Sequence, residues 1–330
     1  MEGISQLVEL PSLSTIHLRR YGPTDEEWQV SNTSSLTGLP PVLICVHGAG
    51  MSSMSFGPVA AIISAAQVSD EHSFACRVVS IDLPCHGDSA DGPQAEAGLT
   101  LDNLVAHFVA TVLHLKRVAF PKTDRFFYAG HSLGGSIVAF GATDVALAPF
   151  LGGVVMLDIV ENVAKLSLRY MNSVLDKRPA SFESSREAAH WFVTQGGMFN
   201  ESIAQLTTPF LLRQESEKGP FMWRTNLRKT EPCWPTWFEG LDQRFVSLTC
   251  PKMLLLATTD RLDNELTTAH MQGKFQLEVV GTQGHYVMED EPTVVAAKLM
   301  RFICRVDMLS NKLSLLNRRL SAQTQANAVS

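Results

Sequence analysis

Residues 130–134 have the types and spacing of a reactive serine held in a tight turn. They read Gly-His-Ser-Leu-Gly, the G-x-S-x-G pattern, with Ser132 at the centre. An apolar run at 125–129 comes before the pattern, and a helix-like segment follows it. Flanking glycines let the backbone turn sharply from strand to helix, which presents the serine hydroxyl above the sheet edge. The pattern predicts that Ser132 is a nucleophile for acyl transfer. An ordinary tight turn is the alternative.

A serine nucleophile needs a base, and His285 has the best context among the ten histidines. It lies in a loop between the last predicted strand and the last predicted helix, where a base could reach the serine. His47 and His131 belong to motifs around the predicted site, and we expect them to orient the backbone. His86 lies in a turn after a strand, and we expect a structural role.

Residues 47–50 read His-Gly-Ala-Gly directly after an apolar run, which predicts an oxyanion hole. Acyl transfer puts negative charge on the carbonyl oxygen, and one preset backbone N–H donor stabilises it by roughly 3–4 kcal/mol in known cases. Small residues let the backbone approach the substrate closely. We assign the donors to the N–H groups of Ala49 and Leu133. A plain glycine turn is the alternative.

Two aspartates qualify as the acid that orients the histidine. Asp158 follows the strand-like run 152–157, and Asp260 follows the run 252–257 with Asp263 close behind. The chain order Ser, Asp, His holds for either choice. The pattern alone leaves both open, and the other aspartate would cap a loop or pair with a lid residue.

Apolar strand-like runs alternate with amphipathic helix-like segments over most of the chain, which predicts a mostly parallel sheet covered on both faces. The predicted strands are 41–46, 77–83, 125–129, 152–157, 252–257 and 275–280. One predicted helix carries an apolar stripe from Leu101 to Val112, a second follows Ser132, and a third begins at Pro292. The run Ile16–Arg20 predicts antiparallel strands at one edge.

The alternation stops between about 161 and 249. This stretch is helical in pattern and contains four of the five tryptophans: Trp191, Trp223, Trp234 and Trp237. An insertion between two strands predicts a lid over the strand ends, where open α/β sheets bind ligands. We therefore predict a core of 1–160 and 250–306, a lid of 161–249, and a partly disordered tail of 307–330. Within the lid, the polar segment 214–220 predicts a mobile loop.

The composition fits a folded enzyme and favours neither a nucleic-acid nor a membrane partner. The 330 residues are 45% hydrophobic and 18% charged, with a formal net charge of -6. Nucleic-acid binding needs a basic face, and no apolar run reaches the ~18–20 residues of a membrane span. The N-terminus lacks a signal-peptide pattern, so we expect the cytoplasm and/or the nucleus. Six scattered cysteines fit neither a disulfide framework nor a zinc site.

From Leu43 to Arg301 the chain resembles the protein phosphatase methylesterases, a family of α/β hydrolases. The resemblance rests on segments that a general hydrolase does not need: Asp158–Glu161, Arg178-Pro179 with Phe182, Trp223-Arg224, Lys229–Glu231, Trp234, Trp237-Phe238, Gly240-Leu241, Asp260–Asp263, Met271–Gln276, Gly284-His285 and Glu289-Asp290.

The resemblance implies an α/β-hydrolase fold with a helical lid between the sixth and seventh strands. It implies removal of the methyl ester from the C-terminal leucine of the protein phosphatase 2A catalytic subunit, with no metal or organic cofactor. It favours Asp158 as the acid, because the family places its acid after the sixth strand. Arg224, Lys229, Trp237 and Asp260 are expected substrate or partner contacts. A small-molecule carboxylesterase or lipase, and a non-catalytic binding module, are the alternatives.

Overall fold

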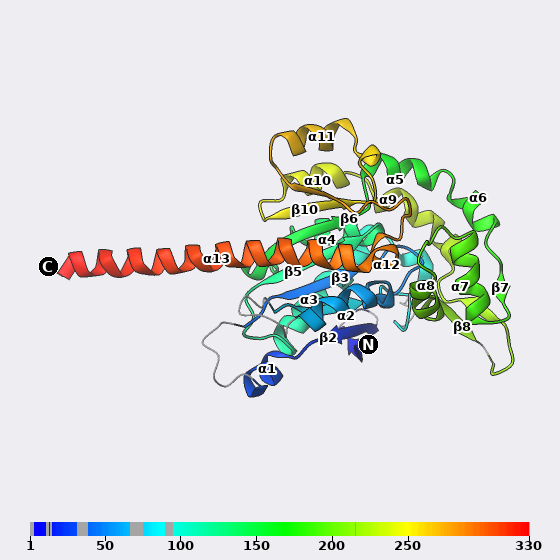
Figure 1. Cartoon of the computed structure of the whole chain (residues 1–330), viewed down its shortest axis with the longest axis horizontal. Coiled ribbons are helices and arrows are strands. Elements are labelled where there is room, and N and C mark those ends of the chain that lie inside the picture. Colours follow the sequence, from blue (N-terminus) through cyan, green and yellow to red (C-terminus); the bar gives the residue numbers. More distant parts are fainter. Residues whose placement is uncertain are drawn as a thin grey trace.

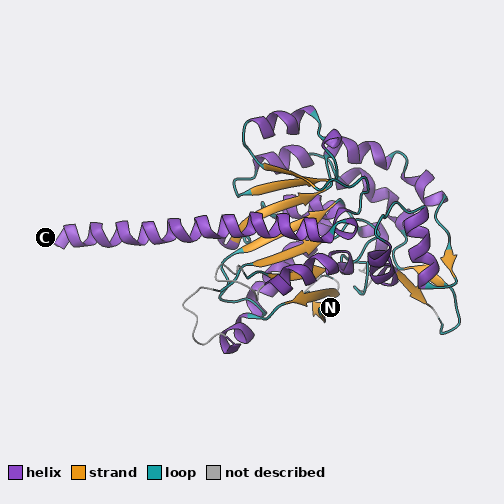
Figure 2. Cartoon of the chain, in the orientation of Figure 1, coloured by secondary structure: helices purple, strands orange, loops and turns teal. Residues whose placement is uncertain are grey.

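A central sheet of eight strands organises the computed structural model (Figures 1 and 2). The strand order is β1-β2-β4-β3-β5-β6-β10-β11. The strands are β1 Ile4–Glu9, β2 Thr15–Tyr21, β3 Val42–Val46, β4 Arg77–Ile81, β5 Phe126–His131, β6 Leu151–Leu157, β10 Lys252–Leu256 and β11 Gln276–Val279. The structure describes residues 3–10, 13, 15–31, 39–66, 75–89, 95–214 and 216–329.

The strand directions confirm the predicted fold class. From β4 to β11 each neighbouring pair is parallel. The β1 and β2 strands pair antiparallel with each other, and β2 is antiparallel to β4, which confirms the predicted antiparallel edge. The six predicted core strands match β3, β4, β5, β6, β10 and β11, because fully buried parallel strands are continuous apolar runs.

Helices cover both faces of the sheet because side chains alternate along each strand. The helices outside the predicted lid, together with α10, are α1 Asp25–Ser31, α2 Gly57–Ala65, α3 Leu101–Val118, α4 Leu133–Gly141, α10 Leu241–Ser247, α11 Asn264–Met271, α12 Val287–Asp290 and α13 Pro292–Val329. In β3, Val42, Ile44 and Val46 join a cluster with α3, α4 and α10, whereas Leu43 and Cys45 join α2 and α13 on the other face.

The last helix, α13, starts at Pro292 as predicted. Its apolar stripe of Val295, Leu299 and Ile303 is buried against the sheet. The helix then continues across the predicted boundary at residue 306, and its far end stands away from the rest of the molecule (Figure 1). The predicted core and tail therefore share one helix, and the partial disorder of the tail stays a prediction.

No helix within the described ranges is long and apolar enough to cross a membrane. The cytoplasmic or nuclear location stays a prediction, which microscopy of the tagged protein would test.

The segment between β6 and β10 is mainly helical, as predicted, with one addition. Three short strands form a separate antiparallel sheet in the order β7-β9-β8. With two or three residues each, they are too short to show a strand period in the sequence. The elements before α10 are α5 Glu161–Leu168, α6 Met171–Asp176, β7 Ser181–Phe182, α7 Ser185–Thr194, α8 Glu201–Thr207, β8 Leu212–Gln214, β9 Phe221–Trp223 and α9 Trp234–Trp237.

Two parts of this segment bear on the predicted lid. The elements α6, α7, β7 and β8 gather at the end of the molecule opposite the C-terminus of α13 (Figure 1). In contrast, α10 packs against α4 beside the sheet, so it lies with the core. The predicted loop 214–220 falls on the connection between β8 and β9, where residue 215 lies outside the described residues. The lid boundaries and the mobility of the loop stay predictions.

A fully buried carboxyl group lies in α12, next to the loop that carries the predicted base. The Glu289 side chain is 0% exposed. Burial raises the pKa of Glu289 to about 8, and the nearby Asp290 acts in the same direction, while hydroxyl groups of Thr207 and Ser55 lower it. Because an unfolded glutamate has a pKa near 4.3, the folded protein keeps a proton that the unfolded chain loses.

We predict that Glu289 makes the protein less stable as the pH rises from about 5 to 8. In this window the folded state binds the extra proton, so the free energy of unfolding falls with rising pH. Glu289→Gln keeps the shape and stays neutral, so its urea midpoint should change less between pH 5 and pH 8 than that of the wild type. Glu265→Gln, at an exposed position in α11, is the matched control. Equal pH dependence in Glu289→Gln and the wild type would contradict the prediction.

Candidate active site

Ser132 stands on a strained turn between β5 and α4. Its backbone has φ 52° and ψ -120°, a conformation that residues with a side chain rarely adopt. A Cβ atom at Gly130 would lie 2.0 Å from the carbonyl oxygen of Gly134, and one at Gly134 would lie 2.2 Å from that of Val46. Any side chain at either position would therefore collide with backbone. This close approach is the physical reason for both glycines of the G-x-S-x-G pattern.

His285 and Asp158 meet at the same edge of the sheet. Asp158 directly follows β6, and His285 lies in the loop between β11 and α12. The imidazole Nδ1 of His285 lies 2.7 Å from the Asp158 Oδ2, and the aspartate side chain is buried while 44% of the histidine side chain is exposed. A carboxylate accepts from Nδ1–H, so Nε2 of His285 is left to act as a base.

Asp158 is held as an ionised carboxylate. Burial alone would raise its pKa, but the hydrogen bonds from His285 and the Ala257 N–H, with the charge of Arg261, outweigh it and lower the pKa below the ordinary value. The Ala257 N–H donates to Oδ1 over 2.9 Å, and the guanidinium of Arg261 pairs with Oδ2. The carboxylate therefore keeps its negative charge at neutral pH, where it can stabilise a protonated His285.

His131 links the serine turn to the loop of His285. Its Nε2 lies 2.7 Å from the carbonyl oxygen of His285, and the two rings are 4.6 Å apart between centroids. A carbonyl only accepts, so this nitrogen carries the proton and donates it. Burial lowers the pKa of His131 to about 3, which keeps the ring neutral. This bond ties the residue next to Ser132 to the loop of His285, and the role of His131 is to orient backbone as expected.

The loop of residues 47–50 lies directly against Ser132. A Cβ at Gly48 would lie 3.0 Å from the Ser132 Cβ, tighter than nearly all real Cβ contacts, so a side chain here would press on the serine turn. Ala49, the next residue, is a predicted donor. Leu133, the other predicted donor, is the first residue of α4. The first N–H groups of a helix have no intrahelical acceptor, and they favour negative charge. Both predicted N–H groups therefore lie on the segments that flank the serine.

Two buried neutral histidines hold this loop in place. His47 Nδ1 donates to the Gly48 carbonyl over 2.8 Å, while its Nε2 accepts from the Leu83 N–H over 3.0 Å. His86 Nε2 accepts from the Gly50 N–H over 2.9 Å. Burial lowers the pKa of His47 and lowers that of His86 to about 3. A neutral ring can accept one bond and donate another, which is what pins the loop.

Comparison with known proteins places this site in a family. The model of the alpha/beta hydrolase family matches residues 43–298. The chain is 37% identical over 261 residues to protein phosphatase methylesterase 1 of Schizosaccharomyces pombe, covering 79% of this chain and 74% of the relative. The chain belongs to the protein phosphatase methylesterase family.

Other relatives and solved structures agree with this membership. A probable protein phosphatase methylesterase 1 of Caenorhabditis elegans is 33% identical over 278 residues, covering 84% of this chain and 72% of the relative. The Cryptococcus neoformans relative is 37% identical, and 63% of its length is matched. The structure of E-2-(acetamidomethylene)succinate hydrolase matches with a TM-score of 0.66 at 16% identity, covering 91% of this chain and 98% of that chain. At this low identity, the structural match shows the fold alone.

In this methylesterase family member, Asp260 lies apart from the base. It belongs to the short 3-10 helix Thr259–Arg261, is exposed, and accepts from the hydroxyl of Thr258. Asp263 caps α11 through the Leu266 N–H over 2.9 Å. The structure thus brings Asp158, and not Asp260, to His285.

The residues predicted to contact the substrate or a partner differ in how exposed their side chains are. Trp237 is 1% exposed and donates to the Leu99 carbonyl over 2.7 Å, so its expected contact role is corrected to a role in the core. Arg224 donates from Nε and Nη1 to the carbonyls of Leu212 and Gly87, and its contact role stays a prediction. The side chain of Lys229 is 64% exposed and lies 3.8 Å from Glu96, which leaves it accessible. Aromatic composition alone does not tell a buried tryptophan from an exposed one.

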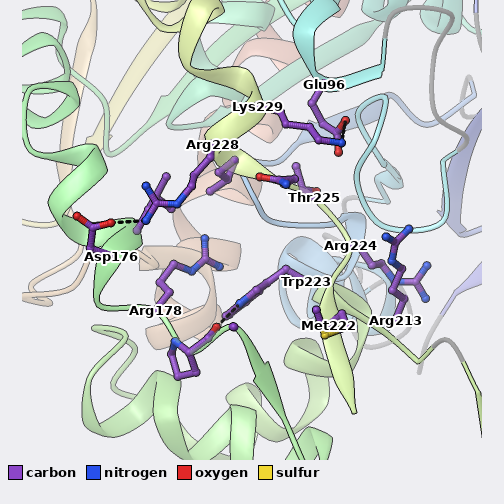
Figure 3. A pocket seen from close by; sticks show the side chains of 15 residues that line it. Glu96, Asp176, Arg178, Arg213, Met222, Trp223, Arg224, Thr225, Arg228 and Lys229 are labelled. Atoms are coloured by element: carbon purple, nitrogen blue, oxygen red, sulfur yellow. Dashed lines mark hydrogen bonds and ion pairs between the residues drawn. The ribbon is translucent and has the colours of Figure 1, made fainter. Parts of the chain in front are cut away.

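Two groups of functional interest were not predicted. Arg261 and His285 both contact Oδ2 of Asp158. The position of Arg261 just after β10, the strand that neighbours β6, is the sequence feature that could have indicated this contact. The second is a pocket rich in arginine, lined mainly by residues between 175 and 229 (Figure 3). Two of its basic residues, Arg224 and Lys229, were predicted contacts, but the pocket as a whole was not predicted. The arginines of the pocket are scattered over about 50 residues of the sequence, so no local sequence pattern predicts the pocket.

We predict that Asp158→Asn lowers kcat toward a small activated ester by about 10⁴-fold, the loss seen when the same change is made in a known triad. The amide keeps the shape but cannot stabilise a protonated His285. Asp260→Asn is the matched control, and its kcat on the same ester should stay close to that of the wild type. Steady-state kinetics with both variants, after circular dichroism confirms folding, is the measurement. The reverse ranking of the two variants would refute the assignment.

Proposed function

We propose that this protein hydrolyses the methyl ester on the C-terminal leucine of the protein phosphatase 2A catalytic subunit. The hydrogen bond from His285 to the buried Asp158, at the sheet edge that also presents Ser132, is the observation that carries the proposal. The names of the relatives support the substrate class, because each matches this chain over most of its length.

In the first half of the proposed reaction, the hydroxyl oxygen of Ser132 attacks the ester carbonyl carbon. His285 Nε2 takes the hydroxyl proton, and the Asp158 carboxylate stabilises the resulting imidazolium. The carbonyl oxygen becomes an oxyanion, which the N–H groups of Ala49 and Leu133 stabilise. The carbon–methoxy bond then breaks as His285 returns the proton to the methoxy oxygen, and methanol leaves an acyl-enzyme on Ser132.

The second half repeats the chemistry with water. A water molecule gives a proton to His285 Nε2 and adds to the acyl carbon, which forms a second oxyanion at the same two donors. The bond to Ser132 breaks, its oxygen regains the proton from His285, and the leucine leaves as a carboxylic acid that loses its proton to water. The protons that move between Ser132, methanol and the attacking water all pass through His285, so the reaction depends on the hydrogen bond that orients this ring.

We predict that Ser132→Ala abolishes demethylation of the methylated catalytic subunit, with a loss in kcat of up to roughly 10⁶-fold, as for removal of the nucleophile in a serine protease. Ser136→Ala, one turn further along α4 and buried, is the matched control and should keep the activity of the wild type. Mass spectrometry of the phosphatase tail measures the loss of the methyl group.

The same assay separates the alternatives. Wild-type protein that cleaves small esters but leaves the methylated subunit unchanged is a small-molecule carboxylesterase or lipase. Wild-type protein that binds the subunit but cleaves neither substrate is a binding module. Either result would overturn the proposed function.

A further inference from the structure

A cationic pocket of about 480 Å³ opens between the segment that joins β6 to β10 and the residues around Glu96 (Figure 3). Five basic side chains line it, against two carboxylates, Glu96 and Asp176; the basic ones are Arg178, Arg213, Arg224, Arg228 and Lys229. A concave surface with this excess of positive charge favours an anionic ligand, because like charges lining one pocket add to a positive potential.

Three of the five cations already have a carboxylate partner in the chain. Arg228 pairs with Asp176, and Lys229 lies 3.8 Å from Glu96. Arg224 lies 3.1 Å from Asp88. Among the residues that the structure describes, Arg178 and Arg213 have no carboxylate within ion-pair distance. Within the described part of the chain, these two guanidinium groups are therefore the uncompensated charges of the pocket.

Arg178 is the better placed of the two. Its guanidinium carbon lies 3.7 Å from the centre of the Trp223 ring, and Figure 3 shows the side chain reaching into the middle of the pocket. The indole is itself fixed, because its N–H donates to the Pro179 carbonyl over 2.8 Å. Burial lowers the pKa of Arg178, which reflects the cost of a charge that no carboxylate offsets. An arginine stacked on a fixed ring presents its N–H groups edge-on, the geometry that suits a carboxylate or phosphate.

Two sets of contacts connect the pocket to segments of the proposed active site. Leu227 lines the pocket and packs on Gly50, where an added Cβ would lie 2.8 Å from the leucine Cδ1. On the other side, aromatic rings connect Trp223 to Phe192, with centroids 5.8 Å apart, and Phe192 to Tyr286, 6.0 Å apart. Tyr286 directly follows His285. A chain bound at Ser132 would therefore reach the pocket within a few residues.

We propose that this pocket binds an anionic side chain, a carboxylate or a phosphate group, of the polypeptide substrate, in the residues that precede its methylated C-terminus. The inference rests on the proposed esterase function and adds a determinant of substrate choice. Arg178 is the main contact and Arg213 the second. An acidic tail would be selected over a neutral one through KM, because the pocket acts on binding and lies away from the reacting carbonyl.

The test is a set of synthetic peptides that end in leucine methyl ester. Each carries one glutamate, moved through the residues before the leucine, and each has a partner peptide with glutamine at that position. The readout is the ratio of kcat/KM for the glutamate peptide to that for the glutamine peptide. The wild type should favour glutamate by about tenfold at one or two positions, the size expected of a charge-assisted hydrogen bond.

Arg178→Gln should bring this ratio close to one, and Arg178→Lys should restore part of it. Arg213→Gln, at an exposed position, should reduce the ratio less. It is the second variant that tests the pocket if Arg178→Gln does not fold. Arg186→Gln is the matched control, since it removes an exposed arginine of α7 that does not line the pocket. This control should keep the ratio of the wild type.

The outcomes separate this proposal from the esterase function itself. The wild type could cleave the glutamate and glutamine peptides equally at every position. It would then be an esterase whose pocket does not bind an anionic side chain of the substrate, which overturns the inference alone. Wild-type protein that demethylates neither these peptides nor the methylated catalytic subunit overturns the proposed function. In a further arm, inorganic phosphate should inhibit cleavage of the preferred glutamate peptide more than that of its glutamine partner. Equal effects on both peptides would identify a site for free anions and contradict a substrate side-chain site.

Discussion

The close contact of three backbone segments at the Ser132 turn is the constraint on which the rest of the site depends. The chain leaves β5, reverses at Ser132 and enters α4 so tightly that positions 130 and 134 have no room for a side chain. Gly48 meets the same turn from β3. Because the three segments touch, the serine hydroxyl and the predicted N–H donors are set by packing in the core. A strained residue persists only where its surroundings over-determine it, and such strain is common at active sites.

Electrostatic roles around this turn follow from burial. The rings of His47, His86 and His131 are deeply buried and neutral, so they serve as hydrogen-bond bridges between loops. His285 is the exposed member of the group, and its carboxylate partner Asp158 is ionised. The site therefore separates one histidine that can exchange protons from three that hold the backbone. Arg261 adds a positive charge to the same carboxylate, which favours its ionised form.

The sequence predicts the parallel core and part of the site, and the limits have physical reasons. Strands such as β3 are continuous apolar runs, and Ser132 and His285 lie in local patterns that a single segment carries. The choice between Asp158 and Asp260 needs three dimensions, because each follows one of two neighbouring parallel strands and only the folded chain shows which of them reaches His285. The strands β7, β8 and β9 are too short for the sequence to show the alternation of side chains that is typical of a strand. The cationic pocket combines residues distant in the sequence, and burial of Trp237 depends on packing that composition does not reveal.

The central claim is that Ser132 is the nucleophile, activated by His285. Mapping the adduct of a fluorophosphonate probe by mass spectrometry tests it most directly, because the probe reacts with an activated serine and stays bound. The account predicts one adduct, on Ser132, in the folded protein, and much slower labelling in a His285→Ala variant. An adduct on another serine, or a Ser132 that stays unmodified in protein that hydrolyses esters, would contradict it.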